Sequence, residues 1–568
     1  MAKQLQPASV ADEIIPDRNV EAQSTFATST LVADVEKSPP RKTTVAETEH
    51  KSIFGSVIDT SPSRTGSGAV LEAKAQLLNQ ALLDIGMGRY QWFLFLITSV
   101  GWFLDSFWIT SFVVINPAAA DEAQFFFSGD KSTYLPVSLF VGLAVGAAAW
   151  PWMSDTLGRK WIFTSTVVLM GMGGLVGAGM PSFTGLCVVG CVVGIAIGGN
   201  QLITGTILVE MLPASHQFLV AMQGLFWGLG QVVAYAVGWA FIAGYTCGTG
   251  PDKISTQQAL GHGKRAGHSG SGSGDSCHYV SNKGWRYVWW TFGCITLFVY
   301  LCRFFFPLRE TPKHLLARRR DAEATQIVKD IAAYNGRQTW LTEASFARID
   351  STVDAAERSR QSRTRSLVSP LGLVGFPILV LLWIITGLSF ILHKTYISNY
   401  QASKGVSAVT AQSVSTDYLF SRYLYVAICA IPGPIVAALL IEVKGLGRKR
   451  TGAIIALLTG LFMFLAAVAR SRNAALAFEC ILSFLEFAGL AVLTTYTVEV
   501  FPSPVRGSGL AVMGFSWGLF GLIAQIVSVF AGSTVAGGGP VWFCGAVWIV
   551  MVGAWLVLPL ETRARAAA

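Results

Sequence analysis

The chain has 568 residues, of which 52% are hydrophobic and only 13% are charged. A soluble globular chain carries about 25% charged residues, so this composition excludes an ordinary soluble domain and indicates a membrane protein. The formal net charge of +9 would also suit a nucleic-acid-binding protein, but the Lys and Arg residues lie mostly between apolar stretches and form no continuous basic domain.

The first 72 residues are predicted to form a disordered tail. They are rich in Ser, Thr, Ala and mixed charge, and they hold no apolar run of about 7–15 residues such as a signal peptide needs. Such a segment buries too little apolar surface to offset the entropy lost on ordering. We therefore expect the first spanning helix to act as its own insertion signal.

Twelve stretches are long and apolar enough to cross a bilayer as helices, which takes about 20 residues each. A polar segment, residues 307–371, separates the sixth stretch from the seventh, and its sequence DAEATQIVKDIAAYN predicts an amphipathic helix. The twelve stretches lie at about 90–116, 134–153, 161–180, 184–209, 218–243, 286–306, 373–398, 418–441, 451–470, 474–498, 508–531 and 541–560.

The basic residues predict which membrane face each loop occupies. A cytoplasmic N-terminus places the basic residues at 159–160, the 307–371 linker and the basic run at 444–450 on the cytoplasmic face, as the positive-inside rule requires. Basic residues at 470–472 and within the loop at 244–285 do not fit this orientation. Both termini are therefore predicted to be cytoplasmic.

The predicted protein is an all-α membrane protein of two six-helix bundles. Its parts are a disordered cytoplasmic tail (1–72), an N-terminal bundle (85–306), a cytoplasmic linker (307–371), a C-terminal bundle (372–561) and a short cytoplasmic tail (562–568).

Most of the nine cysteines lie inside apolar stretches, where cysteine is usually a small hydrophobic residue. Cys247 and Cys277 differ, because they flank a polar loop. If that loop faces an oxidising compartment, they form a disulfide; otherwise both are free thiols. No Cys or His spacing predicts a metal site.

The chain contains an internal repeat. VEMLPASHQFLVAMQGLFWGLG begins at Val209, and VEVFPSPVRGSGLAVMGFSWGLFG begins at Val498, 289 positions later. The same shift aligns Gly158 with Gly447. Because an even number of spans precedes the second copy, both copies cross the membrane in the same direction, which predicts two parallel repeats.

Several motifs resemble those of the major facilitator superfamily. WPWMSDTLGRKW is similar to that family's loop between helices two and three, and FPLRETPK and LPLETR are similar to the signatures that follow helices six and twelve in sugar-porter-like members. LDIGMGRYQWFLFLITSVGWFLD and GIAIGGNQLITGTILVEMLP resemble the fungal members of the synaptic-vesicle-protein-2-related branch. The resemblance covers about residues 85–562 and implies a twelve-helix transporter.

The chain departs from the family pattern in three places. Pro151 replaces the first Gly of the loop motif. Lys444 stands at the Asp position of the second copy, with Glu442 two residues earlier. Helix four has Thr204 where the branch usually has an acid, which weakens the case for proton coupling through helix four.

Charged residues inside spans are costly, so each needs a reason. Asp105, in the middle of the first span, is predicted to accept a proton or a cationic substrate; the alternative is a carboxylate tied to a nearby polar group. The 289-residue shift carries Asp105 onto Lys394. We hypothesise that the two face each other across the outer cavity, whereas a Lys394 side chain that only reaches the membrane interface is the alternative.

Other residues are weaker candidates for the substrate site. Glu486 lies at mid-span in helix ten, and Asn200 lies in helix four. Arg422 could attract an anion, although an interface anchor is the simpler interpretation. Trp383 could stack on a substrate ring, or could only pack between helices.

The family resemblance also implies a cytoplasmic gate. It implies that Glu210 and Glu499 pair with Arg159 and Arg448, and that Arg506 belongs to the same layer. Asp155 would face a helix N-terminus, whose dipole favours a negative charge.

The sequence therefore predicts a secondary transporter that works by alternating access and moves a small polar solute, such as a sugar-like compound, a carboxylate or another organic anion. Proton symport is the leading mechanism, and the expected partners are the substrate, a proton and the bilayer, with a monomer in the plasma membrane. An exporter, or a non-transporting sensor of the same fold, is the alternative. No catalytic constellation, cofactor motif or metal site is predicted.

Overall fold

The computed structural model describes residues 69–126, 134–246, 282–352, 371–403, 416–531 and 539–563. All regular structure in these ranges is helical, and they contain no strand. The predicted Cys247–Cys277 pair lies outside the described residues, and the seven cysteines within them are free thiols.

Within the described ranges, twelve helical segments are long and apolar enough to span a membrane, so the predicted count is confirmed. Two of these spans are interrupted. The fifth consists of α7 and α8, which meet at Gln223, and the eighth consists of α16 and α17, which meet at Ile431. Pro432 follows that second break, and because proline has no N–H it cannot continue the helical hydrogen bonds.

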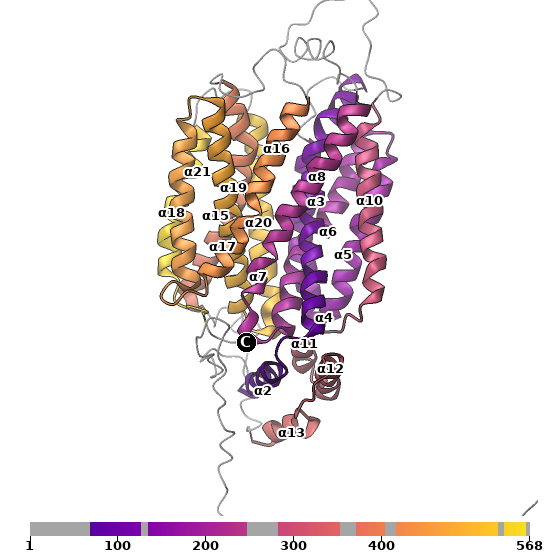
Figure 1. The fold of residues 1–568 in the computed structure, drawn as a ribbon, viewed down its shortest axis with the longest axis vertical. Helices are drawn as coiled ribbons and strands as arrows, with labels where there is room; N and C mark the ends of the chain where they lie inside the picture. The colour runs from indigo at the N-terminus through magenta and orange to yellow at the C-terminus, as the bar shows by residue number, and fades with distance from the viewer. Residues whose placement is uncertain are drawn as a thin grey trace, which may run out of the picture. The chain divides into compact units, whose positions relative to one another are not determined.

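The first six spans form one half of the protein, and the last six form the other (Figure 1). The first half contains α3 (Arg89–Phe126), α4 (Tyr134–Leu157), α5 (Arg159–Ala178), α6 (Phe183–Met211), α7 (Leu219–Met222) with α8 (Gly224–Tyr245), and α10 (Gly284–Cys302). The second half contains α15 (Gly372–Ser403), α16 (Thr416–Ala430) with α17 (Pro432–Leu440), α18 (Gly447–Ala467), α19 (Arg472–Val500), α20 (Ser503–Ala531) and α21 (Gly539–Val557).

Four shorter helices pack together at one end of the bundles, which we call the linker side (Figure 1). They are α2 (Ala69–Ile85), α11 (Pro312–Ala317), α12 (Asp321–Tyr334) and α13 (Glu343–Thr352). Short 3-10 turns lie at Ala214–His216 (η1) and Arg303–Phe305 (η2). The amphipathic helix predicted in the linker is α12.

The helix α2 joins the segment before the first span to the linker. Leu78 and Leu82 of α2 are fully buried in one cluster with Val328 of α12. The Lys74 Nζ donates to Asp350 at 2.7 Å and also contacts Asp321. The prediction of a disordered tail up to residue 72 therefore needs a correction, because the last four of those residues already belong to α2.

Glycine lets α4 and α6 approach until their backbones touch. A Cβ on Gly142 or Gly146 would overlap the carbonyl groups of Cys191 or Ile195, and one on Gly198 would lie 2.3 Å from the Leu143 carbonyl oxygen. Contacts between small residues are a main source of helix association in membranes, where lipid is as apolar as the helices.

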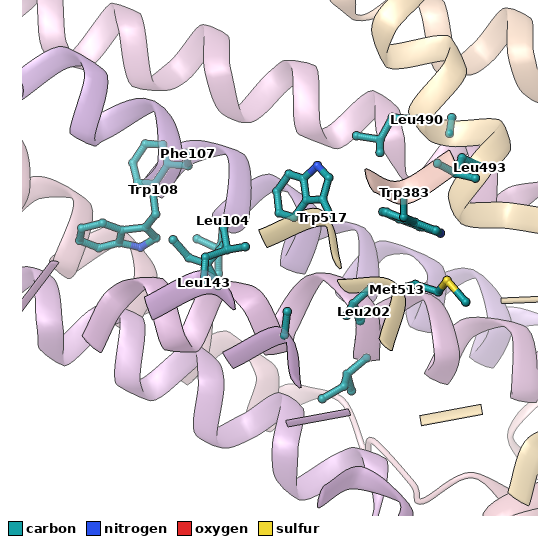
Figure 2. Packing of buried hydrophobic residues seen from close by; sticks show 14 of the residues in the cluster. Leu104, Phe107, Trp108, Leu143, Leu202, Trp383, Leu490, Leu493, Met513 and Trp517 are labelled. Carbon is teal, nitrogen blue, oxygen red and sulfur yellow. The ribbon is translucent and has the colours of Figure 1, made fainter. Parts of the chain in front are cut away.

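The two halves meet through α4 and α20. Gly518 of α20 packs against the backbone of Ala144, so that the neighbouring Trp517 inserts between the halves. Figure 2 shows Trp517 between Leu104 and Leu143 of the first half and Trp383 of the second. The bundles therefore share one continuous apolar core.

The glycine contacts can be tested by adding a single methyl group. We expect Gly198→Ala to lower the melting temperature, because its Cβ would meet fixed backbone atoms and overpacking costs about 1–3 kcal/mol. Gly553→Ala in α21 is the matched control, since no atom lies within 4 Å of its Cβ position. Alanine favours a helix over glycine by about 1 kcal/mol, so the control should melt no lower than the wild type. Equal melting temperatures for both variants would contradict this packing account.

Candidate functional site

Four aromatic side chains connect the halves deep inside the protein. Trp102 of α3 lies edge-on to Trp227 of α8, with ring centroids 5.8 Å apart. Phe487 of α19 is 6.5 Å from Trp227 and 5.8 Å from Phe390 of α15. We call these four residues the aromatic cluster. It is built equally from the two halves, so any movement of one half against the other must change it.

Asp105 lies one helical turn after Trp102 and is fully buried. Asn200 of α6 donates its amide N–H to Asp105 Oδ1 at 2.9 Å and to the Gly101 carbonyl at 3.0 Å. The other carboxylate oxygen, Oδ2, has no hydrogen-bond partner in the part of the chain that the structure describes. No cation there lies within ion-pair distance of Asp105, so its charge can be neutralised by a proton or by a cationic ligand.

Thr204 occupies the helix-four position of the usual acid, and no hydrogen bond joins it to Asp105 in the described structure. The Thr204 hydroxyl donates to the backbone carbonyl of Asn200 at 3.0 Å, within its own helix. Asn200 is thus the residue by which α6 reaches Asp105, and Asp105 is the buried carboxylate next to the aromatic cluster on the first half.

The second half places a charged group on the other side of the cluster. Glu486, next to Phe487, contacts His393 Nδ1 at 2.9 Å and Lys394 Nζ at 3.1 Å. The Lys394 Nζ also lies 5.7 Å from the centre of the Phe390 ring. The Lys394 side chain is 33% exposed, whereas Glu486 is buried. Lys394 is therefore a cation at the edge of the aromatic cluster that water or a ligand can reach.

The hypothesised contact between Asp105 and Lys394 is absent. Asp105 is bound to Asn200 within the first half, and Lys394 is bound to Glu486 within the second. The repeat fixes corresponding places in two bundles, and corresponding places need not be neighbours. A pair between Asp105 and Lys394 that forms in another state of the transport cycle stays a prediction. Lys394 does not act only as an interface anchor either, since it pairs with a buried carboxylate.

Several buried polar atoms belong to residues within about one helical turn of a residue of the aromatic cluster and have no hydrogen-bond partner among the described residues. Buried polar groups are nearly always satisfied, so a group of exceptions indicates a place that water or a ligand occupies. The atoms are Trp102 Nε1, Asp105 Oδ2, Ser106 Oγ, Gln223 Oε1, His393 Nε2 and Ser483 Oγ.

Two of the sequence candidates have structural partners instead. The Trp383 indole is buried, and its N–H donates to the Thr497 hydroxyl at 3.0 Å, so this side chain ties α15 to α19. Arg422 lies 3.5 Å from Glu479 and is mostly buried. Neither residue presents a free polar group to the aromatic cluster.

A second set of charged residues joins the halves on the linker side. Glu210 of α6 accepts a hydrogen bond from Arg506 of α20 at 2.6 Å and pairs with Arg159 of α5 at 3.3 Å. Asp155 of α4 accepts hydrogen bonds from the Ser508 N–H and hydroxyl in the first turns of α20, at 3.1 and 2.9 Å. We call Asp155, Arg159, Glu210 and Arg506 the gate cluster.

The corresponding residues of the second half stay within that half. Arg448 of α18 contacts Glu499 of α19 at 2.9 Å and Glu442 at 3.0 Å. Glu442 therefore forms an ion pair with Arg448, as Asp155 does with Arg159. This contact explains why the second copy does not need an Asp at position 444. Among the described ion pairs, the charge contact that crosses between the halves uses Arg506 and Glu210.

Two glutamates that were not among the candidates hold the gate arginines in place. Glu310 accepts from the backbone N–H groups of Arg159 and Lys160 at 2.9 and 3.2 Å, and Glu561 accepts from those of Arg448 and Lys449 at 2.9 and 3.1 Å. Each carboxylate caps a helix N-terminus, where the helix dipole favours negative charge. The motifs FPLRETPK and LPLETR contain both glutamates, so the repeat carried this signal.

The linker inserts two further groups at the gate cluster. Lys313 and His314 of α11 are both buried, and His314 contacts Arg159. Burial and the nearby Arg506 guanidinium lower the pKa of Lys313 to about 7, and only Glu210 opposes the shift. Burial and Arg159 lower the pKa of His314 to about 4. Lys313 is the last residue of the motif FPLRETPK, but the motif alone did not indicate that Lys313 and His314 fold back against the gate cluster.

Comparison with known proteins identifies the arrangement. The family described as Major Facilitator Superfamily matches residues 91–525. An MFS siderochrome iron transporter 1 of the fungus Ceriporiopsis subvermispora is 34% identical over 513 residues, covering 88% of this chain and 92% of the relative. The niacin transporter NiaP of Acinetobacter baylyi is 24% identical, covering 78% of this chain and 88% of that protein.

The comparison also includes a relative from the predicted branch and a solved structure with the predicted fold. A synaptic vesicle 2-related protein of Xenopus laevis is 21% identical over 448 residues, covering 76% of this chain and 72% of that protein. The solved proton:xylose symporter XylE with bound 6-bromo-6-deoxy-D-glucose has the same fold, with a TM-score of 0.64 and 17% identity, over 84% of this chain and 98% of that one.

The gate cluster should respond to pH through Lys313. If the halves separate on the linker side, Lys313 becomes hydrated and its pKa returns toward 10.5. Between about pH 7 and 10.5, the Lys313 amine therefore binds a proton when the halves separate. Joined halves should therefore be favoured as pH rises through this window, by up to about tenfold per pH unit, and the dependence should flatten below about pH 7.

Spin labels at the exposed positions 157 and 444 would measure the distance between the halves from pH 6 to 9. In Lys313→Met the pH dependence should disappear. In Lys313→Arg the charge persists, so the separated population should stay at the low-pH level of the wild type and exceed the wild type only above about pH 7. An unchanged pH profile in Lys313→Met would exclude Lys313 as the responsible group.

Proposed function

Because the chain belongs to the major facilitator superfamily, and is a transporter of small solutes rather than an enzyme, we propose that it carries a small organic anion with a planar ring by proton-coupled symport. The observation that carries this proposal is the aromatic cluster between the halves, which has Asp105 and Asn200 on one side and Lys394 and Glu486 on the other.

The cargo is inferred from the groups that meet at this place. Aromatic faces stack on planar rings, and an ammonium group binds a carboxylate with charge-assisted hydrogen bonds. Lys394 offers such an ammonium group at the rim of the cluster, and the N–H of Trp102 lacks a partner among the described residues. A neutral sugar has no negative charge for the Lys394 ammonium group to bind, so this cation favours an aromatic or heteroaromatic acid.

The names of related proteins do not by themselves select a cargo. Siderochrome iron, niacin and xylose stand in the names of proteins similar to this chain, and these are chemically unlike compounds. Niacin is a planar ring that bears a carboxylate, and of the three it agrees best with the aromatic cluster and Lys394.

The proposed proton site is Asp105. Its carboxylate is fully buried, has Asn200 as its hydrogen-bond partner and has no cation within ion-pair distance in the described chain. A proton that binds at Oδ2 removes the buried charge and makes this oxygen a donor. Since the substrate brings a negative charge to the same region, proton and substrate would favour each other's binding.

The proposed cycle is alternating access. In this structure the gate cluster joins the halves on the linker side, with Arg506 of one half against Glu210 of the other. Opening that side would break this contact and expose Lys313. By the positive-inside rule the linker side is assigned to the cytoplasm, and the proposed setting is a monomer in the plasma membrane with both termini inside.

Asp105 can be tested by separating coupled uptake from exchange. In proteoliposomes with an inward proton gradient, we expect Asp105→Asn to abolish accumulation of labelled nicotinate but to retain exchange of internal for external substrate, because the neutral amide mimics a permanently protonated carboxyl group. Asp84→Asn is the control, since Asp84 is exposed, its Oδ2 accepts from the Trp340 indole of the linker, and this contact does not join the halves. Accumulation by Asp105→Asn at the wild-type level would remove Asp105 from the mechanism.

The anion preference can be tested on Lys394. We expect nicotinate and benzoate to compete with each other for uptake, and nicotinamide and xylose to compete at least about tenfold less well. We expect Lys394→Gln to raise the KM for nicotinate by about tenfold or more, because it removes one charge-assisted hydrogen bond to the carboxylate. Equal competition by nicotinamide would overturn the assignment of an acid. Saturable binding without flux would instead identify a sensor of the same fold, and flux only in the outward direction would identify an exporter.

A further inference from the structure

An apolar groove lies on the outer surface of the first half, and no residue of the aromatic cluster lines it. It has a volume of about 330 Å³ and is bounded by α3, α5 and α10, with Tyr334 of the linker helix α12 at its end. The lining is almost entirely hydrocarbon and includes Leu96, Val100, Phe163 and Val299. A groove of this kind on the outside of a membrane bundle faces lipid chains.

One cation, Arg303, lines this groove. It begins the 3-10 turn η2 directly after α10, and its side chain is partly buried. Its guanidinium donates to the Thr164 hydroxyl and lies 5.8 Å from the Phe163 ring. Among the described residues it has no carboxylate partner and no other side-chain hydrogen bond, although a guanidinium carries five N–H donors.

The surroundings place this cation at the edge of the hydrocarbon layer. Phe305, two residues later, is 91% exposed, and Phe304 is 71% exposed. Such exposure of large aromatic side chains on a spanning bundle indicates contact with lipid. Leu308 and the rest of the linker follow at once, so Arg303 lies where acyl chains end and headgroup phosphates begin.

We propose that this groove is a binding site for one anionic phospholipid. An acyl chain fills the groove, and the lipid phosphate binds the guanidinium of Arg303, which supplies the missing counter-charge. An arginine fork matches phosphate geometry, and a basic residue near a membrane surface contributes about 1 kcal/mol to the binding of anionic lipid.

The internal repeat supports a specific role for the first half. When Pro307 is aligned with Pro559 in the two similar motifs, Trp555 stands at the position of Arg303. Trp555 is buried against Gly452 of α18 and Tyr496 of α19. The second half thus uses this position for packing, and the first half uses it to present a cation to the membrane.

The test compares lipid binding by purified full-length protein variants. Each variant is titrated in detergent with phosphatidylserine, phosphatidylcholine or soluble glycerol phosphate, and bound lipid is counted by native mass spectrometry while the melting temperature is followed in parallel. Arg303→Gln removes the charge, and Arg303→Lys restores it. Arg450→Gln is the matched control, because Arg450 is an exposed arginine at the linker-side end of α18 whose guanidinium donates to the Gly445 carbonyl.

We expect the wild type to retain one phosphatidylserine molecule with at least about fivefold preference over phosphatidylcholine, which corresponds to about 1 kcal/mol. This preference should be lost in Arg303→Gln, largely regained in Arg303→Lys and unchanged in Arg450→Gln, and glycerol phosphate should not compete. Equal retention by Arg303→Gln, equal loss in Arg450→Gln, or full competition by glycerol phosphate would each overturn the proposal.

Discussion

The contact on which the two-half arrangement depends is the buried carboxylate of Glu210 between two arginines. Arg159 belongs to the same half and Arg506 to the other, so one glutamate belongs to both an internal ion pair and a contact between the halves. A buried ion pair stabilises little in itself, because desolvation offsets most of the attraction, but separating its members leaves uncompensated charge in a dry place. The Glu210–Arg506 contact is therefore expected either to be fully formed or to be fully separated, with both charges hydrated.

The two halves use the same residues differently. Arg448 and Glu499 repeat Arg159 and Glu210, yet their ion pair stays inside the second half. The linker adds Lys313 beside Glu210 and Arg506, where the arginines already supply two positive charges to one carboxylate. The repeated fold is thus asymmetric at the contact between its halves because of single residues, and this asymmetry predicts that the contact responds to pH.

The aromatic cluster and the gate cluster divide the work of the protein. The gate residues lie in the motifs that the two halves repeat, because closing a membrane path is a requirement common to carriers of many cargoes. Asp105, Lys394 and three of the four aromatic residues lie outside those motifs, whereas Trp227 lies within the first copy. We propose that this set supplies the groups that distinguish one cargo from another. The partly buried Arg303 belongs to neither set. We propose that it binds a lipid and not the substrate.

The sequence alone determined the twelve spans, the parallel repeat and the family, because span length, hydropathy and local motifs are properties of neighbouring residues. It also indicated which charges in the membrane need partners. The partners themselves became known only from the tertiary structure. Asp105 is hydrogen-bonded to Asn200, Lys394 forms an ion pair with Glu486, and Lys313 of the linker lies beside Glu210 and Arg506 of the gate cluster. Side chains from distant segments meet according to the packing of whole helices, and no spacing along the chain encodes that geometry.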